Sequence, residues 1–500
     1  MNVILITSDQ QRYDSLGCYG SDFVSTPTID SLAEDGFRFG RAYCANPVCS
    51  PSRLSLFTGK CIDRHGVYNC GINVPEDELL LTHRLKAHGY GTYHIGKLHF
   101  NHWFGGFEES IEAHNPDVWP KRYPEFTGPY YGFDHVEMSM GHTQYGRTGH
   151  YGCWAQEKLN ELGIDQVKIT PMSNVDFGGR AYEWNLPSEA SDGAWIAERA
   201  TEFIKSDASK QPFFLNLGFQ DPHHPHILHR SKAETLQPDK IPLPHYIDGE
   251  LDDKPPFFNT ARKGWLHKSE YQGAYHVAGQ IPGHDISLVS DEDARLGRAY
   301  YYGMAEQLDH YVGEIITSLK ENGLYDDTMI IFTTDHGELL GDHGIWMKGP
   351  FMYEQLIRVP LIIKWPKQAY RGESDTLVSL TDVAPTILAT LGLETPEDMD
   401  GVDFTPHVTG QSASPHGFIT VHHVDDPKKI RVKTVVTSRY KLTFHYGQPY
   451  GELYDLADDP WEVQNLWSED EFSKIKAELL SFLTNHSERL EKRLPRPYYV

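Results

Sequence analysis

The run NPVCSPSRLSLFTGK places a cysteine, Cys49, directly before a stretch with the pattern of a short helix. Ser50 is expected to cap this helix, Pro51 suits its first turn, and Gly59 is expected to end it. Cys49 would then lie at the positive end of the helix, where anions bind and where a thiol is more acidic. On this pattern alone, Cys49 is a packed core residue, a nucleophile or the substrate of a chemical modification.

Four short apolar runs, each bounded by Gly, Pro or polar residues, are predicted to be buried parallel strands. Each run is followed by residues that can do acid, base or metal chemistry. The four runs with these residues are 3–7 with Asp9 and Gln10, 89–95 with Lys97 and His99, 212–219 with Asp221, His223 and His224, and 328–334 with Asp335 and His336. Helical patterns over 194–204 and 296–319 alternate with the runs. This alternation predicts an α/β fold with an open, doubly wound sheet, whose site lies beyond the carboxyl ends of its strands.

The length of 500 residues favours a large α/β domain followed by a smaller one. We place a catalytic domain at 1–410 and a small C-terminal α+β subdomain at 411–500, in which an antiparallel sheet is followed by a helix near 470–492. Two stretches of the first domain, about 100–190 and 221–290, lack clean periodicity and are rich in Trp, Tyr, His, Pro and Gly. Long inserts are usually functional, so we expect these two to form walls of a substrate pocket rather than surface decoration.

The composition narrows the possible partners. A formal net charge of −25 argues against nucleic acid and anionic membranes, so an anionic substrate would need a local cluster of Arg and Lys. No apolar run approaches the roughly 18 residues that span a bilayer. The first residues show neither a basic segment nor a cleavage site, which gives the expectation of a cytoplasmic protein, or a periplasmic one if the chain was trimmed. The six cysteines lie in the first third of a long chain and are not expected to form a disulfide framework.

Six sequence blocks resemble those of one enzyme family. The run CSPSR with the following LSLFTGK is similar to the signature of the formylglycine-dependent (type I) sulfatases, in the alkaline phosphatase superfamily, and GYGTYHIGKLHF is similar to that family's second signature. DPHHP, TDHGELLGDHG, MKGPFMYEQLIRVPLII and ELYDLADDPWEVQNL are similar to further family blocks, in the family's order. The resemblance extends from Asp9 to about Leu466. It implies an alkaline-phosphatase-like mixed sheet flanked by helices, and the hydrolysis of sulfuric esters.

The resemblance implies how a sulfate ester would be attacked. Cys49 would be oxidised to formylglycine by a formylglycine-generating enzyme, and the hydrated aldehyde would be the nucleophile, anchored by Arg53. Lys97 and Lys348 would hold sulfate oxygens. These roles are physically reasonable, because a sulfate ester monoanion repels a nucleophile until cations spread its charge.

The resemblance also implies two proton transfers by histidine. His99 would take a proton from the second hydroxyl of the hydrated aldehyde when sulfate is expelled by carbon–oxygen cleavage. His223 would protonate the departing alcohol. Two histidines suit two opposite proton transfers near neutral pH.

A divalent cation is implied at Asp9, Asp335 and His336, together with the oxygen of the modified Cys49. Carboxylate oxygens favour a hard cation, and calcium is the expected ion. Many family members have a second Asp at the position of Gln10 and Asn at that of His336. The pairs in this chain instead resemble phosphonate monoester hydrolases, choline sulfatases and some carbohydrate sulfatases. Gln10 could still give a carbonyl oxygen, and the imidazole makes manganese or zinc more tolerable, with magnesium also possible.

These residues favour a hydrolase that releases inorganic sulfate from an organic sulfate ester, and the aromatic-rich inserts suit a sulfated saccharide. The main alternative is a phosphonate monoester or phosphodiester hydrolase that uses the same formylglycine, but Lys97 and His99 match sulfatases. A glycan-binding protein without catalysis should have lost Cys49 or the metal carboxylates, and neither is lost. A redox-sensing protein would need a second cysteine near Cys49; Cys44 is close in sequence, but nothing else supports this reading. The aromatic tail 493–500 could dock on a neighbouring chain or pack on its own, so the oligomeric state stays open.

Overall fold

The computed structural model describes most of the chain. The described residues are 1–103, 110–113, 125–141, 147–173, 176–264, 285–426 and 430–490, and for Asp426 and residues 487–490 only the backbone is described. The aromatic tail 493–500 and parts of the two long inserts therefore lie outside the described residues. Within the described part, no helix is both long and apolar enough to cross a membrane.

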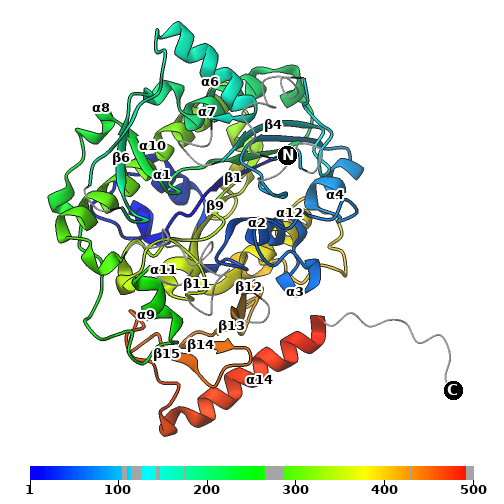
Figure 1. Ribbon diagram of the computed structural model, residues 1–500. Coiled ribbons are helices and arrows are strands. Elements are labelled where there is room, and N and C mark those ends of the chain that lie inside the picture. Colours follow the sequence, from blue (N-terminus) through cyan, green and yellow to red (C-terminus); the bar gives the residue numbers. More distant parts are fainter. Residues whose placement is uncertain are drawn as a thin grey trace.

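A mixed eight-stranded sheet forms the centre of the molecule (Figure 1). Its strands, in their order across the sheet, are β11 (Gly372–Ser379), β2 (Phe37–Tyr43), β10 (Arg358–Lys364), β9 (Thr328–Thr334), β1 (Asn2–Ser8), β7 (Phe213–Gly218), β3 (Gly91–Gly96) and β4 (His135–Met140). The strands from β9 to β4 run parallel, whereas β10 is antiparallel to both of its neighbours. The four apolar runs of the sequence are thus four adjacent parallel strands, which confirms the predicted α/β fold.

Helices cover both faces of this sheet (Figure 1). One face carries α1 (Pro27–Asp35), α7 (Asp192–Lys205) and α10 (Asp291–Glu321), and the other carries α2 (Cys49–Thr58) and α12 (Val383–Thr390). Within β1, Ile4 and Ile6 belong to the core under α7 and α10, whereas Val3 and Leu5 belong to the core under α2 and α12. Successive side chains of a strand point to opposite faces, so a strand covered on both sides is largely apolar on both.

A second, separate sheet follows the large one, as the C-terminal sequence pattern predicts. It is antiparallel, with its strands in chain order: β12 (Ile419–Asp426), β13 (Ile430–Val436), β14 (Tyr440–His445) and β15 (Gly451–Asp455). Helix α14 (Ser473–Leu490) packs against this sheet through Leu479 and Leu483. The predicted domain boundary at residue 410 stays a prediction.

A buried lysine joins this second sheet to the large domain. Lys441 of β14 is fully buried, donates to Oε1 of Glu354 at 3.1 Å, and forms an ion pair with Glu462. Glu354 begins the short helix α11 (Glu354–Ile357), directly before β10. Since breaking a buried ion pair leaves an uncompensated charge, this contact resists separation of the two parts.

The stretch 100–190 is not an insert throughout. It contains β4, which completes the large sheet, and α6 (Gly149–Glu161), which packs beside β4. A third sheet, formed by β5 (Ile169–Pro171), β6 (Ala181–Trp184) and β8 (His226–His229), joins this stretch to the second one. The remaining α-helices of the described residues are α3 (Ile62–His65), α4 (Leu81–Ala87), α8 (Arg230–Ala233), α9 (Phe257–Arg262) and α13 (Thr405–Val408).

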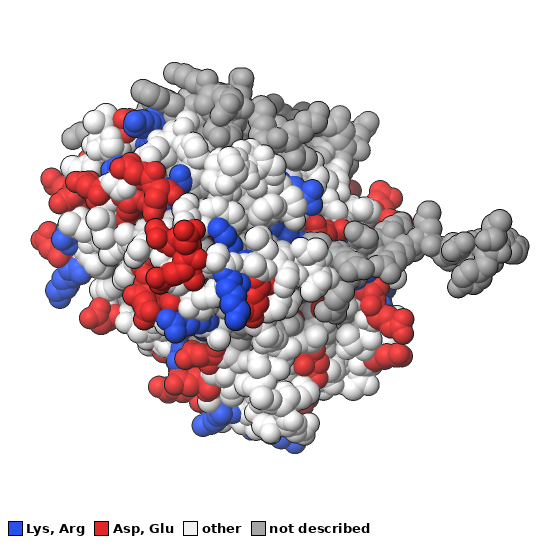
Figure 2. Space-filling view, turned by 90° about the horizontal axis from the view of Figure 1, so that it is seen from below, with Lys and Arg blue, Asp and Glu red and all other residues white. Residues whose placement is uncertain are grey.

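Surface charges of both signs are mixed. On the face shown in Figure 2, Asp and Glu side chains gather in clusters, with Lys and Arg side chains between them. The formal net charge of the whole chain is −25. Because a net negative charge repels anions, cations that bind an anionic substrate have to be concentrated at the site itself.

Two glycines hold β3 and β7 together at the ends where the polar residues begin. Gly96 has a φ of 108°, and a Cβ at this residue would fall on the carbonyl oxygen of Gly218. A Cβ on Gly218 would fall on the carbonyl oxygen of Lys97, whose own N–H donates to the Gly218 carbonyl at 2.7 Å. Only glycine allows two backbones to approach this closely.

The variant Gly218→Ala is expected to displace Lys97. Because the clash is with backbone, we expect a loss of about 1–3 kcal/mol in the free energy of unfolding. Turnover should fall about 10²-fold, since small displacements of binding groups are costly in catalysis. Urea unfolding and steady-state kinetics measure the two effects. Gly417→Ala is the matched control, because Gly417 is exposed and a Cβ there meets nothing within 4 Å; equal effects of the two variants would contradict the expectation.

Candidate active site

Helix α2 presents Cys49 at its first residue, at the positive end of the helix as predicted. The prediction that Ser50 caps the helix is wrong: Ser50 lies inside it, and the Ser50 hydroxyl has no hydrogen-bond partner among the described residues. The cap residue is Val48, whose backbone is extended and whose N–H donates to the side-chain oxygen of Asn46 at 2.9 Å. Gly59 ends the helix in the left-handed conformation, as predicted.

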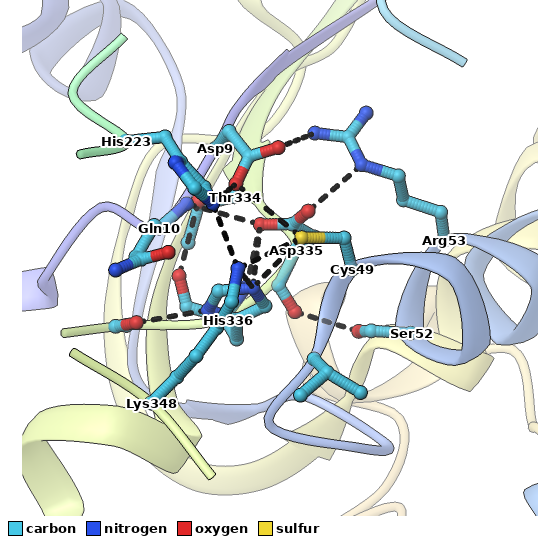
Figure 3. Close-up of polar contacts among 12 residues, drawn as sticks. Asp9, Gln10, Cys49, Ser52, Arg53, His223, Thr334, Asp335, His336 and Lys348 are labelled. Carbon is cyan, nitrogen blue, oxygen red and sulfur yellow. Dashed lines mark hydrogen bonds and ion pairs between the residues drawn. The ribbon is translucent and has the colours of Figure 1, made fainter. Parts of the chain in front are cut away.

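Cys49 faces residues at the ends of β1 and β9 (Figure 3). Its sulfur, a carboxylate oxygen each of Asp9 and Asp335, and a ring nitrogen of His336 lie within 4.8 Å of one another, and all four residues are buried. The sulfur is 3.7 Å from Oδ1 of Asp9 and 3.4 Å from Nε2 of His336. The structure therefore brings together four of the five residues predicted for the metal site.

Arg53 lies one turn into α2 and bridges the two carboxylates. Its Nε donates to Oδ2 of Asp335 at 2.8 Å, and its Nη2 donates to Oδ2 of Asp9 at 3.1 Å (Figure 3). Lys97 forms a further ion pair with Asp9. Burial and the Cys49 sulfur both favour the neutral form of Asp9, but the surrounding cations outweigh them and lower its pKa. Burial raises the pKa of Asp335, although Arg53 opposes this shift.

Lys348 reaches the same cluster from the loop that follows β9. Its ammonium lies 3.0 Å from the sulfur of Cys49, 2.9 Å from Nε2 of His223 and 3.3 Å from Nε2 of His336 (Figure 3). Burial would lower the pKa of Lys348, but the negative charges around it, that of Cys49 first, raise it above its usual value. Lys348 is therefore a charged ammonium beside the sulfur.

The two histidines predicted to transfer protons both lie at the cluster. A ring nitrogen of His99 lies within 4.8 Å of the Cys49 sulfur, and Nε2 of His223 lies 2.9 Å from the ammonium of Lys348. Nδ1 of His223 donates to the carbonyl of His224 at 2.6 Å, because that oxygen can only accept, and this leaves Nε2 as the acceptor that faces Lys348. Burial, followed by the charge of Lys348, lowers the pKa of His223 to about 3. Burial also lowers the pKa of His99 to about 4, against the hydrogen bond with Cys49. Both rings are neutral near pH 7 before a substrate binds.

Gln10 lies beside the cluster, and its backbone has a left-handed φ of 59°. Its N–H donates to Oδ1 of Asp335 at 3.1 Å. Its side-chain nitrogen donates to Glu338 and lies 3.3 Å from Nδ1 of His224. Its side-chain oxygen, Oε1, is buried and has no hydrogen-bond partner within the described part of the chain. A buried polar atom in this position is available to a cation.

The donor set fits a divalent cation. Asp9 and Asp335 offer carboxylate oxygens, and Gln10 offers the buried Oε1. His336 offers Nε2, because its Nδ1 lies 2.9 Å from the carbonyl of Gly337 and must carry the proton. Oxygen ligands favour a hard cation such as calcium, while the imidazole also suits manganese or zinc.

Three residues at the site, Trp103, Cys70 and Glu338, were not predicted. The ring of Trp103 stacks on His99, with centroids 3.8 Å apart and planes 17° apart, and its centroid lies 4.7 Å from the ammonium of Lys97. Trp103 follows the block GYGTYHIGKLHF by three residues and Glu338 lies within TDHGELLGDHG, so both could have been found from their neighbours. Cys70 lies in a turn, where no periodic pattern marks it.

Cys70 adds to the electrostatic environment of Cys49. The sulfur atoms of the two cysteines and a ring nitrogen of His99 lie within 4.8 Å of one another. Burial would raise the pKa of the Cys49 thiol, but the hydrogen bond with Cys70 and the charges of Lys348 and Lys97 lower it well below its usual value. Position 49 thus stabilises negative charge.

Comparison with protein families decides what kind of enzyme this site belongs to. Residues 1–393 match the sulfatase family, which is well over half of the chain. The chain belongs to the sulfatase family. It is a sulfuric ester hydrolase, as predicted. Residues 341–489 also match the C-terminal region of N-sulphoglucosamine sulphohydrolase.

Known sulfatases are similar to this one over nearly its whole length. An arylsulfatase of Clostridium perfringens is 26% identical over 481 residues, which are 95% of this chain and 91% of the relative. An N-acetylglucosamine-6-O-sulfatase of Bacteroides thetaiotaomicron is 25% identical over 519 residues, which are 96% of this chain and 85% of the relative. The solved structure of a phosphonate monoester hydrolase of Agrobacterium radiobacter has a TM-score of 0.77 and 23% identity, and the match covers 98% of this chain and 96% of that one. This likeness supports the predicted alkaline-phosphatase-like fold.

Because the donor set fits a divalent cation, loss of such an ion is expected to abolish the turnover of this sulfatase. The fold should stay in place, because the apolar cores do not include the residues of the donor set. Treatment with a chelator, followed by activity assays and circular dichroism, tests this. Asp335→Asn should lower the bound metal measured by elemental analysis and reduce turnover at least about 10²-fold. Asp207→Asn, at a site 93% exposed, is the matched control. Full activity of metal-depleted protein would reject Asp9, Asp335 and His336 as functional ligands.

Proposed function

We propose that this sulfatase releases inorganic sulfate from a sulfated saccharide, with Cys49 converted to formylglycine as its nucleophile. The observation that carries the proposal is the group of cations around Cys49. Arg53 and Lys97 are buried and Lys348 is half-buried, in a chain whose formal net charge is −25. Cations that are fixed in place and shielded from water stabilise the charge of a reacting anion far better than cations in solution.

The three cations have different partners and therefore different tasks. Arg53 contacts both carboxylates, so it holds Asp9 and Asp335 in position. Lys348 is half-buried and 3.0 Å from the sulfur of Cys49, so it is placed to hold an oxygen of the sulfate group. Lys97 is held between Asp9 and a tryptophan ring, and it is the second cation that sulfate oxygens can reach.

Formylglycine at position 49 would supply, once hydrated, two hydroxyl groups on one carbon. The run CSPSR supports this modification, and a formylglycine-generating enzyme is the partner that it implies. The N-terminus of α2 and the ammonium of Lys348 favour negative charge at this position, which assists a nucleophilic oxygen.

His223 is proposed to protonate the departing alcohol. Before substrate binds, its Nε2 carries no proton and accepts a hydrogen bond from Lys348. An anionic sulfate group beside this ring would raise its pKa and draw a proton to Nε2. His99 is held neutral against Trp103, so it can accept a proton from position 49 in the later release of sulfate.

The proposed cation is calcium, with manganese, magnesium and zinc as alternatives that elemental analysis would distinguish. Asp9, Asp335 and His336 would hold it, with Oε1 of Gln10 as a further ligand. The ion would supply positive charge next to position 49.

Two observations support a saccharide as the substrate. One of the similar proteins is named an N-acetylglucosamine-6-O-sulfatase. In this chain, the half-buried ring of Trp103 lies beside His99 and Lys97, at the edge of the site. Aromatic side chains at the edge of a polar site offer flat apolar surfaces on which a sugar ring can lie.

A phosphonate monoester or phosphodiester hydrolase is the second candidate. The observation in its favour is Gln10, which stands where many sulfatases have an aspartate. The side-chain nitrogen of Gln10 donates a hydrogen bond to Glu338. Against it, Lys97 and His99 both lie at the site, and these two residues match sulfatases rather than phosphonate enzymes.

Conversion of Cys49 can be observed directly. Protein produced with a formylglycine-generating enzyme should contain an aldehyde in place of the thiol, detected by aldehyde-reactive labelling and peptide mass spectrometry. Cys49→Ala should fold normally and lose at least about 10³-fold in turnover, because it removes the nucleophile. Active protein in which every Cys49 is an unmodified cysteine would refute the proposed nucleophile.

Selectivity separates the two candidate functions. Because Lys97 and His99 are placed for sulfate, sulfate esters should show the highest kcat/KM on a panel of sulfate, phosphonate and phosphodiester substrates, with phosphonates as minor activities. A sulfated monosaccharide should be turned over faster than choline sulfate. A higher kcat/KM for a phosphonate monoester would make the second candidate the function.

His223→Ala tests the assignment of the acid. A general acid contributes about 10²–10⁴-fold, mostly when the leaving alkoxide is poor. The variant should therefore lose most activity on sugar sulfates and keep much of its activity on nitrophenyl sulfate, whose phenolate leaves unaided. His229→Ala, in the same segment but outside the cluster, is the control. An unchanged slope of log kcat/KM against leaving-group pKa would make His224 or Lys348 the next candidate.

A further inference from the structure

Cys70 is a second thiol in direct reach of the nucleophile position. Its sulfur and that of Cys49 lie within 4.8 Å of each other. Neither is in a disulfide here, and all six cysteines of the chain are thiols. Cys44, the cysteine nearest to Cys49 in sequence, belongs to neither of the clusters that contain Cys49.

The position of Cys70 is fixed by contacts with the second sheet. The N–H of Cys70 donates to the side-chain oxygen of Asn69 at 2.7 Å. The side-chain nitrogen of Asn69 donates to the carbonyl of Val424 and to Oδ1 of Asp425, each at 3.1 Å. Both partners belong to β12. The hydrogen bonds of Asn69 therefore fix the turn that carries Cys70 in its position beside Cys49.

The two thiols differ in access. Cys49 is 1% exposed, whereas Cys70 is exposed to solvent. The residue that carries the second thiol therefore reaches the surface, whereas Cys49 does not. The pair thus places the thiol of a surface residue next to a buried thiol, and redox-sensing cysteines often lie next to a second cysteine that resolves them.

We infer that, in chains whose Cys49 has not become formylglycine, Cys49 and Cys70 form a disulfide bond by exchange with a low-molecular-weight disulfide such as oxidised glutathione. The sulfur of Cys70 attacks oxidised glutathione, which breaks the glutathione disulfide, forms a mixed disulfide on Cys70 and releases one reduced glutathione. The sulfur of Cys49 then attacks that of Cys70, forms the Cys49–Cys70 bond and displaces the second reduced glutathione. Two thiols are oxidised, and their two protons leave on the two reduced glutathione molecules.

This bond gives residue 49 two exclusive chemical fates. A disulfide consumes the sulfur that conversion to formylglycine requires, and conversion removes the sulfur that the disulfide requires. The bond itself needs only the two thiols, whereas its competition with formylglycine rests on the proposed function. Folded protein that escaped conversion would thereby carry a bond that reduction reverses.

The test uses the full chain produced without a formylglycine-generating enzyme and treated with oxidised glutathione. Intact-mass spectrometry should show the loss of two hydrogen atoms and no retained glutathione, and peptide mapping should join the peptides of Cys49 and Cys70. Reduced glutathione should reverse the change. Cys44→Ser should behave like the parent. Cys70→Ser should give no intramolecular bond, with its thermal unfolding compared to the parent to show that it folds.

Three results would overturn the inference. These are a stable glutathione adduct on Cys70 with Cys49 still a thiol, a bond between Cys49 and Cys44, and an unchanged mass of the parent protein. The converted protein is measured in parallel, and its Cys70 should carry only a mixed disulfide with glutathione. If Cys49 is never converted but still bonds to Cys70, the proposed nucleophile fails while the inference stands. If Cys49 is converted but the unconverted chain forms no bond to Cys70, the inference fails while the proposed nucleophile stands.

Discussion

The buried carboxylate of Asp9 is the interaction on which the rest of the site depends. It lies at the end of β1, in the middle of the large sheet, and forms ion pairs with both Arg53 and Lys97. Taking such charges out of water costs several kcal/mol for each ion, and the attraction between them offsets this cost only when the geometry is good. Without Asp9, Lys97 would lose this buried ion pair and Arg53 would retain the one with Asp335. The ends of β1 and β3 and the first turn of α2 are thus held together by charge as well as by packing.

The large sheet could be predicted because its central strands are buried on both faces. Such strands have a continuous apolar run at their centre, as in β1 and β9, and polar residues stand only at their two ends. The edge strand β4 was missed, because its half-buried His135 and Glu137 interrupt the apolar pattern. The cap of α2 was predicted at the wrong residue, because Ser50 is an acceptable cap by residue type alone. In the structure, the side chain of Asn46 accepts a hydrogen bond from the N–H of the actual cap residue, Val48.

Most of the site could be predicted for a related reason, since parallel strands bring their carboxyl ends to one edge. Asp9, Lys97, His223 and Asp335 each follow one of four neighbouring strands. The position of Cys70 does not follow from such a rule. Its closeness to Cys49 depends on Asn69, whose partner Val424 is 355 residues further along the chain. A contact between residues so far apart in sequence leaves no periodic pattern that could predict it. It is seen only in the structure, where the C-terminal sheet lies against the large domain.

The burial of Cys49 also limits when an enzyme can reach it. In the folded chain Cys49 is 1% exposed, and the ammonium of Lys348 lies directly against its sulfur. Lys348 is made about 300 residues after Cys49, and at roughly 5–20 residues per second this delay is about 15–60 s. During that interval the segment around Cys49 has left the ribosome while the residues that close over it do not yet exist. The yield of protein that carries the proposed formylglycine should therefore depend on a race between maturation and translation, so that slower elongation raises the modified fraction.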